Sequence, residues 1–260
     1  MKMISFSNKK GGVGKTTLCE NVAYKFALDG AKVLLIDLDP QANLTMDFFK
    51  TNDVIDMSLM DLISSKNIIK NTEINKIVKK SKYKNIDIIP AQKELTKSSL
   101  IIGTMYDKTE TYIIADIIYQ SNQEIFDSYD YVLIDYPPTI NEMSLNWLIL
   151  SDLILIPTND AMRSFKGILD LRDNLNVICR QEKRNIPDIK IIFNNIKENI
   201  NTATILNWLQ KEELEKYISK TEIRHSDIFK TIENKLSNVW ENQHYWRQKQ
   251  AYEELIKEIK

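Results

Sequence analysis

Residues 9–17, with the sequence KKGGVGKTT, contain the residue types that bind phosphate groups. Three glycines precede Lys15, and Thr16 follows it directly. Glycines let backbone N–H groups turn toward an anion, the start of a helix favours negative charge, and a lysine adds a full positive charge. A threonine hydroxyl beside that lysine can ligate a Mg²⁺ ion held on the β- and γ-phosphates of a nucleotide. The spacing therefore predicts a site for a nucleoside triphosphate and magnesium.

This run departs from the general P-loop pattern G-x-x-x-x-G-K-[ST], because Lys9 stands where the first glycine is expected. A lysine-rich turn with chance glycines is the alternative. Only six glycines occur in the chain, however, and three of them lie in this run, which indicates that the backbone needs a special conformation here. The residues expected to contact the nucleotide in this run are Lys10, Gly11, Gly12, Val13, Gly14, Lys15, Thr16 and Thr17.

Acidic residues follow two apolar runs further along the chain. Asp37 and Asp39 come after residues 33–36, and Asp135 comes after residues 131–134. We expect Asp37 and Asp135 to join the shell of the Mg²⁺ ion together with Thr16. We expect Asp39 to orient the attacking water in line with the γ-phosphate. A turn that closes a strand would explain Asp39 followed by proline, but not two acids that converge on a phosphate site.

Lys10 is the second departure from the general pattern. It is too far along the loop from Lys15 to duplicate its role, and two lysines would repel each other unless a polyanion lay between or beyond them. The hypothesis is that Lys10 reaches across a two-fold interface to phosphates bound by a partner subunit. The alternative is a solvated surface lysine, as we expect for Lys9.

The order of apolar and helical segments indicates how these residues are positioned. Short apolar runs alternate with helical segments, which predicts an α/β fold of the P-loop NTPase type. We expect a mostly parallel twisted sheet with helices on both faces, and one domain over residues 1–260. In such sheets ligands bind beyond the carboxyl ends of the strands. The expected strands are Met3–Ser7, Lys32–Asp37, Ile86–Ile89, Tyr131–Asp135, Leu153–Pro157 and Lys190–Phe193. The expected helices are Thr16–Asp29, segments near Leu59–Ser64, Thr111–Gln120 and Asn141–Leu150, Phe165 to about Arg180, and helices alone after Phe193.

Composition narrows the class of protein. The chain has a net charge of −1, so binding to nucleic acid would need a local basic patch. No run approaches the roughly 18 consecutive apolar residues of a membrane helix, and Cys19 and Cys179 show no metal-ligand spacing. We therefore expect a cytoplasmic protein. The tail Gln248–Lys260 has apolar residues at helical spacing, and we expect it to dock on the sheet.

Three segments together resemble a known family. Residues 10–17, 37–43 and 135–138 are similar to the deviant Walker A, Walker A′ and Walker B motifs of ParA-type partition ATPases, close relatives of MinD. The resemblance runs nearly end to end. It implies binding of ATP and Mg²⁺, an ATP-sandwich dimer in which Lys10 contacts nucleotide across the interface, and slow hydrolysis supported by Asp39. It also implies a ParB-like partner that, with DNA, stimulates hydrolysis, and a role in plasmid or chromosome partition on the nucleoid.

The resemblance also suggests contact residues outside these motifs. It places nucleotide-base contacts around Phe193-Asn194-Asn195, with Asn194 as the candidate. Family members without an N-terminal helix-turn-helix bind DNA non-specifically through basic residues. The candidates here are Arg224, Lys230 and Lys235, with Arg180, Lys183 and Arg184 as a second cluster. We expect His225 to be structural rather than catalytic, and Trp240 and Trp246 to be core or packing residues rather than platforms on which bases stack.

The chain departs from the family at three places. Lys9 stands where glutamine is common, Ala161 lies near a usual acidic position, and residues 221–226 match only loosely. A MinD-like membrane-positioning ATPase is the alternative function. A basic amphipathic tail would favour it, but the tail of this chain mixes Glu and Lys. A metabolic P-loop ligase or kinase is a third possibility, which the Asp37–Asn43 motif disfavours.

Overall fold

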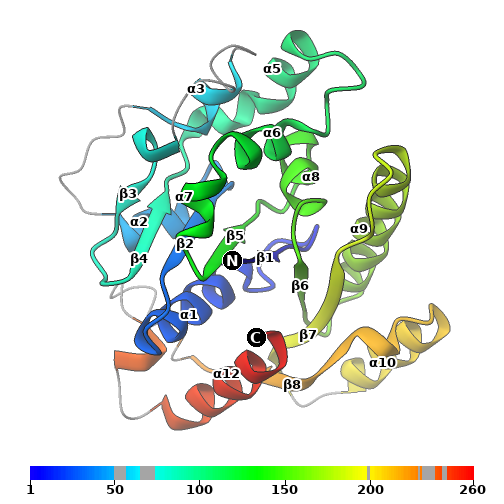
Figure 1. Ribbon diagram of the computed structural model, residues 1–260. Helices are drawn as coiled ribbons and strands as arrows, with labels where there is room; N and C mark the ends of the chain where they lie inside the picture. The colour runs from blue at the N-terminus through cyan, green and yellow to red at the C-terminus, as the bar shows by residue number, and fades with distance from the viewer. Residues whose placement is uncertain (50–56, 65–73, 198–199, 228, 230–237, 242–244) are drawn as a thin grey trace.

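The computed structural model describes residues 1–49, 57–64, 74–197, 200–227, 229, 238–241 and 245–260 (Figure 1). Its strands form an eight-stranded sheet in the order β3-β4-β2-β5-β1-β6-β7-β8. All neighbouring strands run parallel except the edge pair of β3 and β4. The strands are β1 (Lys2–Phe6), β2 (Val33–Asp37), β3 (Lys79–Lys80), β4 (Ile86–Ile89), β5 (Tyr131–Asp135), β6 (Leu153–Thr158), β7 (Asp188–Ile196) and β8 (Ile218–Arg224).

Helices connect the strands. The α-helices are α1 (Lys15–Leu28), α2 (Asn43–Phe48), α3 (Leu59–Ile63), α5 (Ser98–Met105), α6 (Ile114–Ser121), α7 (Gln123–Asp127), α8 (Glu142–Leu148), α9 (Met162–Gln181), α10 (Ile200–Lys211) and α12 (Trp246–Ile259). Short 3₁₀ turns are η1 (Ile74–Lys76), η2 (Lys93–Lys97), η3 (Glu215–Tyr217) and η4 (Val239–Glu241).

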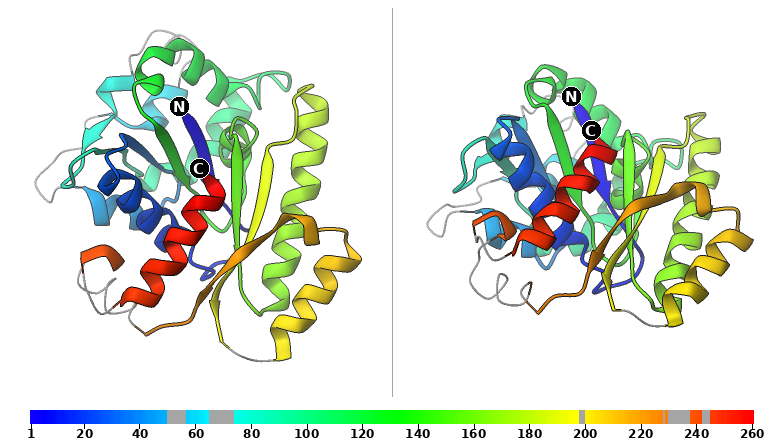
Figure 2. Two further views of the ribbon diagram at one scale, coloured as in Figure 1. Left: turned by 60° about the horizontal axis from the view of Figure 1, so that its bottom comes forward. Right: turned by 90° about the horizontal axis from the view of Figure 1, so that it is seen from below.

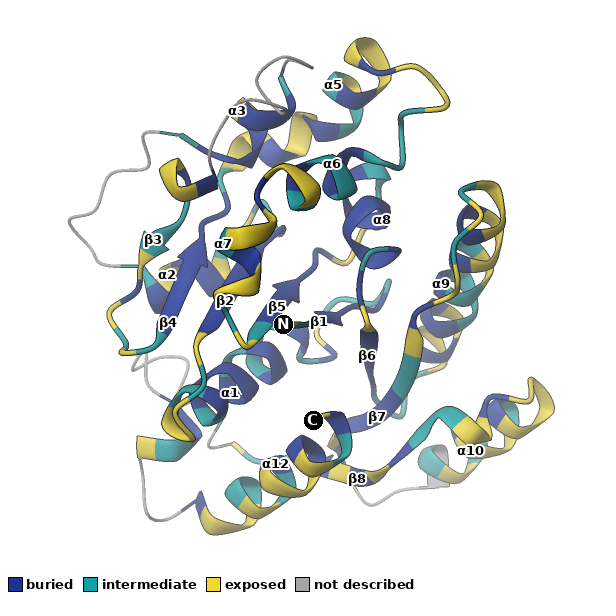
Figure 3. Cartoon of the chain, viewed as in Figure 1, coloured by how far each residue is buried: buried dark blue, intermediate teal, exposed yellow. Residues whose placement is uncertain are grey.

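The sheet separates two apolar cores. Successive strand residues face opposite sides, so Leu34 and Ile36 of β2 join one core while Val33 and Leu35 join the other. Helices α1, α2 and α12 cover the face of Val33, and Figure 2 shows α1 and α12 side by side there. The other face is covered by α3 and by helices from α5 to α10. Figure 3 shows the central strands buried and one side of α9, α10 and α12 exposed. The α/β fold with helices on both faces is confirmed.

The ends of the predicted strands agree with the structure to within two residues, with one exception. Strand β7 continues through residues 194–196, three residues beyond its predicted end. The expectation of helices alone after Phe193 was wrong, because β8 is a parallel edge strand. Its buried side chains alternate, but two of the three, Ser219 and Thr221, are polar. The period of two was therefore not visible as an apolar pattern.

The C-terminal helix docks as predicted. Helix α12 buries Tyr252, Leu255, Ile256 and Ile259 against the sheet. Among the described residues, no helix combines the length and apolar character needed to cross a bilayer.

Candidate functional site

The loop between β1 and α1 has the backbone geometry of a phosphate-binding loop. Gly12 and Gly14 adopt positive φ angles of 73° and 83°, and Gly14 is the N-cap of α1. The first turn of α1 contains no acidic residue that would compete with an anion. A Cβ atom at Gly14 would collide with the side chain of Asn194, whose Nδ2 donates to the Val13 carbonyl at 2.8 Å. Glycine is thus required at position 14 by both its φ angle and its neighbour.

The two lysines of this loop have different surroundings. Lys15 is buried, and its Nζ lies 3.4 Å from the Lys10 carbonyl oxygen. Burial lowers the pKa of Lys15, although the charges of Asp135 and Asp39 counteract that effect. Lys10 is half-buried, and its Nζ donates to the Gly11 carbonyl at 2.8 Å. Within one chain, therefore, the charges of Asp135 and Asp39 act on Lys15, whereas the Lys10 ammonium is bonded to the loop itself.

Parallel pairing brings the acidic residues together. Asp37 and Asp135 end the neighbouring strands β2 and β5 in register, and Phe6 of β1 pairs with Asp135. The Thr16 hydroxyl donates to Asp135 Oδ2 at 2.6 Å, whereas Asp135 Oδ1 is buried without a hydrogen-bond partner. Burial, followed by the charge of Asp37, raises the pKa of Asp135 to about 8. An unpartnered buried carboxylate oxygen beside a threonine hydroxyl fits a hard cation such as Mg²⁺.

Asp37 has a different environment, although it is equally buried. Its Oδ1 accepts from the Asp39 backbone N–H at 2.9 Å, and its Oδ2 accepts from both the N–H and the hydroxyl of Thr45. Burial raises the pKa of Asp37 to about 6, against the effect of these donors. Asp37 therefore holds the loop that carries Asp39, and its role as a metal ligand stays a prediction. Asp39 itself is half-buried, and its carboxylate accepts from the Gln41 N–H at 2.9 Å.

Thr45 is a residue of this site that the sequence analysis missed. Its hydroxyl donates to Asp37 Oδ2 at 2.7 Å and accepts from the Ala91 N–H at 2.8 Å. It thus joins the ends of β2 and β4 through α2. No motif pointed to it, because its partners lie 8 and 46 residues away along the chain.

Replacing Thr45 with valine is expected to destabilise the protein by about 1–3 kcal/mol, because the buried Ala91 N–H and one Asp37 oxygen each lose a partner. Valine fills the same space, so a cavity does not contribute. Urea unfolding measures the change. Thr104→Val, at an exposed threonine that bonds only its own helix, is the control and should change stability by less than about 0.5 kcal/mol. Equal effects of the two substitutions would contradict the assignment.

A pocket of about 280 Å³ opens beside the phosphate-binding loop. Its walls come from the loop, from the ends of β7 and β8, and from α12. The lining residues are Gly12, Gly14, Thr17, Asn194, Asn195, His225, Ser226, Phe229 and Tyr252. Asn194 is therefore at the pocket, as predicted, but its amide N–H₂ is engaged by Val13. Tyr252 was not predicted to line a pocket, because the apolar spacing of residues 248–260 indicates only a packed helix face.

The predicted basic residues lie in different places. Arg224 ends β8 at the same edge as the phosphate loop, and it is exposed and contacts Glu222 at 3.3 Å. Lys230 and Lys235 lie outside the described residues. The second cluster lies between the last turn of α9 and the start of β7 and consists of Arg180, Lys183 and Arg184. Arg184 forms an ion pair with Asp116 at 2.8 Å. This second cluster is therefore at the opposite end of the sheet from the phosphate loop.

Two of the three residues expected to be structural, His225 and Trp240, have the expected surroundings, and Trp246 does not. His225 Nδ1 lies 2.6 Å from Asn195 Oδ1, consistent with a structural role at the pocket wall. Trp240 donates from its indole N–H to the Asn21 carbonyl and is partly buried, as expected. Trp246 is not a core residue, contrary to the first part of the expectation: it is 60% exposed, and its ring packs against the Arg247 guanidinium. Trp246 is the first residue of α12, one and a half turns before the buried stripe begins.

Comparison with known proteins places the chain in a family. A family model described as an AAA domain matches residues 1–191. The chain is 30% identical over 197 residues to the virulence plasmid ParA family protein pGP5-D of Chlamydia psittaci, covering 74% of this chain and 69% of that protein. It is 30% identical over 167 residues to the chromosome-partitioning ATPase Soj of Treponema pallidum, covering 64% and 60% of the two chains.

Solved structures show the same fold. Apo McdA from Cyanothece matches 99% of this chain and 98% of its own with a TM-score of 0.83 at 21% identity. A variant of McdA in complex with ATP gives a TM-score of 0.83 at 20% identity, over 99% of this chain and 95% of its own. At this identity the likeness concerns the fold. Together with the sequence matches, it leads to one conclusion: the chain belongs to the ParA-type partition ATPases.

Proposed function

We propose that the protein is a Mg²⁺-dependent ATPase that dimerises around ATP, binds DNA non-specifically as the dimer, and partitions a plasmid or chromosome with a ParB-like partner. The observation that carries the proposal is the group formed by buried Lys15, the Thr16 hydroxyl and the unpartnered Oδ1 of Asp135. These groups meet at a helix N-terminus, which is where a triphosphate and its cation are bound.

The residues of the site have separable tasks in this proposal. The loop N–H groups and Lys15 hold the β- and γ-phosphates, and Thr16 and Asp135 hold the cation. The bound Mg²⁺ would neutralise charge on the phosphate oxygens. Asp39, half-buried at the edge of the site, orients the attacking water. Asp37 fixes the backbone at this point, because its carboxylate accepts from the Asp39 N–H. Lys10 turns from Gly11 toward the nucleotide of the second subunit.

The docked position of α12 is an argument against the membrane alternative. An amphipathic membrane helix needs a free apolar face, but Tyr252, Leu255, Ile256 and Ile259 are all buried against the sheet. The helix also carries Glu253, Glu254 and Glu258 among its lysines. Binding to a bilayer would therefore require α12 to leave the core. ATP-dependent sedimentation with anionic liposomes would show this binding if it occurs.

DNA binding is expected to depend on ATP and on salt. Asp39→Ala should keep ATP bound without hydrolysis, and its affinity for a random duplex should be at least about tenfold higher with ATP than with ADP. The logarithm of the binding constant should fall linearly with the logarithm of salt concentration, by about 0.9 for each phosphate contacted. Fluorescence anisotropy at several salt concentrations measures both effects.

Single substitutions locate the contact surface in the same assay. Arg224→Gln should reduce the slope by about 1 if this side chain contacts a phosphate. Arg172→Gln is the matched control, because Arg172 on α9 is held by ion pairs with Asp173 and with Glu212, which follows α10. Binding that ignores both ATP and salt would show the proposed function to be wrong.

A further inference from the structure

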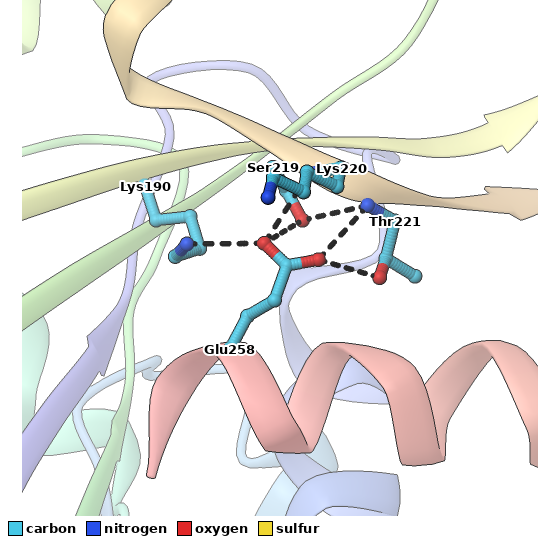
Figure 4. A network of polar contacts seen from close by, with 5 residues as sticks. All are labelled: Lys190, Ser219, Lys220, Thr221 and Glu258. Carbon is cyan, nitrogen blue, oxygen red and sulfur yellow. Dashed lines mark hydrogen bonds and ion pairs between the residues drawn. The ribbon is translucent and has the colours of Figure 1, made fainter.

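Glu258, near the end of α12, binds the edge strand β8 through both of its carboxylate oxygens (Figure 4). Oε1 accepts from the N–H of Thr221 at 3.0 Å and from its hydroxyl at 2.6 Å. Oε2 accepts from the Lys220 N–H at 3.2 Å and the Ser219 hydroxyl at 3.0 Å. Lys190 of β7 completes the group, with its Nζ 3.1 Å from Oε2.

The three β8 residues in this group form an irregular part of the strand. Ile191 pairs with Ile218, but Phe193 pairs with Glu222, so β8 has two more residues than β7 between these pairs. Such a bulge displaces backbone groups from the ladder of hydrogen bonds. The N–H groups of Lys220 and Thr221 bond to the Glu258 carboxylate instead. The bulge is therefore built around a side chain of α12.

The surroundings of Glu258 favour its ionised form. Burial alone would raise the pKa of the carboxyl, but donors from Thr221, Lys190, Ser219 and Lys220 lower this pKa to about 2. Every donor in the group thus faces a full negative charge, and charge-assisted hydrogen bonds are about twice as strong as neutral ones.

Both elements that Glu258 joins also line the pocket beside the phosphate loop. The chain leaves β8 at Arg224 and continues directly into His225 and Ser226, which line that pocket. Helix α12 contributes Tyr252, which is buried and lies between one and two turns before Glu258. A shift of α12 along or away from β8 would therefore change the distance between two walls of the pocket.

We infer that Glu258 is a positioning residue for the nucleotide base: by fixing α12 on the bulge of β8, it sets the spacing between Tyr252 and the His225–Ser226 wall. The inference rests on the proposed function, because it takes a nucleotide to be the occupant of the pocket. Glu258 acts here on the base alone. The phosphate loop is held separately, by its own glycines and by Asn194.

Comparing ADP with inorganic triphosphate, which has no base, tests this role. Glu258→Gln keeps the shape of the side chain but removes its charge and half of its acceptor capacity. It should weaken binding of ADP about tenfold, the equivalent of one hydrogen bond to a charged group. Binding of triphosphate should be unchanged, since the phosphate loop is intact. Isothermal titration calorimetry with magnesium measures both ligands on the full chain.

The matched control is Lys260→Gln. It removes the ion pair between Lys260, the residue that follows α12, and Asp29 at 3.2 Å, and this pair does not involve β8. It should leave the affinity for both ligands unchanged. Lys190→Gln should have a smaller effect than Glu258→Gln, because it removes one donor and leaves the bonds between Glu258 and β8 in place.

The outcomes separate this inference from the proposed function. A wild-type protein that binds neither ligand would overturn both. A Glu258→Gln protein that loses affinity for ADP and triphosphate equally, or for neither, would overturn the positioning role alone. If Glu258→Gln does not fold, Thr221→Val decides: it removes only the 2.6 Å bond to Oε1 and should still weaken ADP selectively. If the ratio of the affinities for ADP and triphosphate in that variant equals the wild-type ratio, the inference is overturned.

Discussion

Replacing Asp135 with asparagine is expected to make the nucleotide-free protein more stable at pH 8 by on the order of 5 kcal/mol, because the pKa of this carboxyl differs by about 4 between the folded and unfolded states. It should also reduce magnesium-dependent ATP hydrolysis by on the order of 100-fold. The stabilisation follows from the surroundings of this carboxyl. Burial and the nearby Asp37 raise the pKa of Asp135 to about 8. The folded protein therefore retains a proton that the unfolded chain releases near pH 4.

The direction of the pH dependence follows from this difference in bound protons. Between about pH 4 and pH 8 the folded state binds more protons at Asp135 than the unfolded state, so wild-type stability falls as the pH rises. Asparagine cannot ionise and removes this contribution. The variant and the wild type should therefore be equally stable near pH 4 and should diverge as the pH approaches 8. Urea unfolding at several pH values, without nucleotide or magnesium, measures the divergence.

The loss of hydrolysis has a separate cause. Asparagine can still accept from the Thr16 hydroxyl, but it brings no negative charge to the cation. Asp39→Asn is the matched control for stability, because Asp39 is half-buried at a loop edge, and it should change the free energy of unfolding by less than about 0.5 kcal/mol. A destabilised Asp135→Asn protein at pH 8 would show that the carboxylate is already compensated in the absence of magnesium. Binding-site residues often lower the stability of the ligand-free protein in this way, because function rather than stability determines them.

The parts of the site that could be predicted from the sequence are those that lie at strand ends. Asp37 and Asp135 follow apolar runs, and parallel strands bring their carboxyl ends to one edge. The phosphate loop could also be predicted, because its glycines and Lys15 lie in one short run of the sequence. In each case a local pattern and one general rule of sheet architecture were sufficient.

The residues that could not be predicted are joined by contacts between distant segments. Thr45 matters because Ala91 donates to it, and Glu258 matters because a bulge 37 residues earlier presents its N–H groups. Neither contact has a sequence pattern of its own. Strand β8 was missed for a related reason: two of the three side chains it buries, Ser219 and Thr221, donate to Glu258 rather than packing in an apolar core. Polar burial of this kind cannot be distinguished from a loop by hydrophobic periodicity.

Lys10→Ala is expected to remove ATP-dependent dimerisation while leaving ATP binding to the single chain nearly intact. In an ATP-sandwich dimer each Lys10 would contact the phosphates of the partner, so the variant loses two hydrogen bonds between charged groups. At about 1.5–3 kcal/mol each, the dimer dissociation constant should rise by on the order of 10²–10⁴. Sedimentation velocity with a non-hydrolysable ATP analogue measures this constant, and titration of the monomer with ADP measures nucleotide affinity.

Lys9→Ala is the control that makes this prediction specific, because Lys9 carries the same charge in the same loop. The backbone of Lys10 is held in a defined position. The Lys10 N–H donates at 3.0 Å to Oδ1 of the buried Asn8, whose amide donates to the Pro157 carbonyl at 2.9 Å. The backbone of Lys10 is therefore fixed to the end of β6, and only its side chain must turn from the Gly11 carbonyl to reach a second subunit.

If the general positive charge of the loop drove association, Lys9→Ala and Lys10→Ala would weaken the dimer equally. A normal dimer in Lys9→Ala and a monomer in Lys10→Ala would instead assign the shared nucleotide contact to Lys10, whose backbone N–H is held by Asn8.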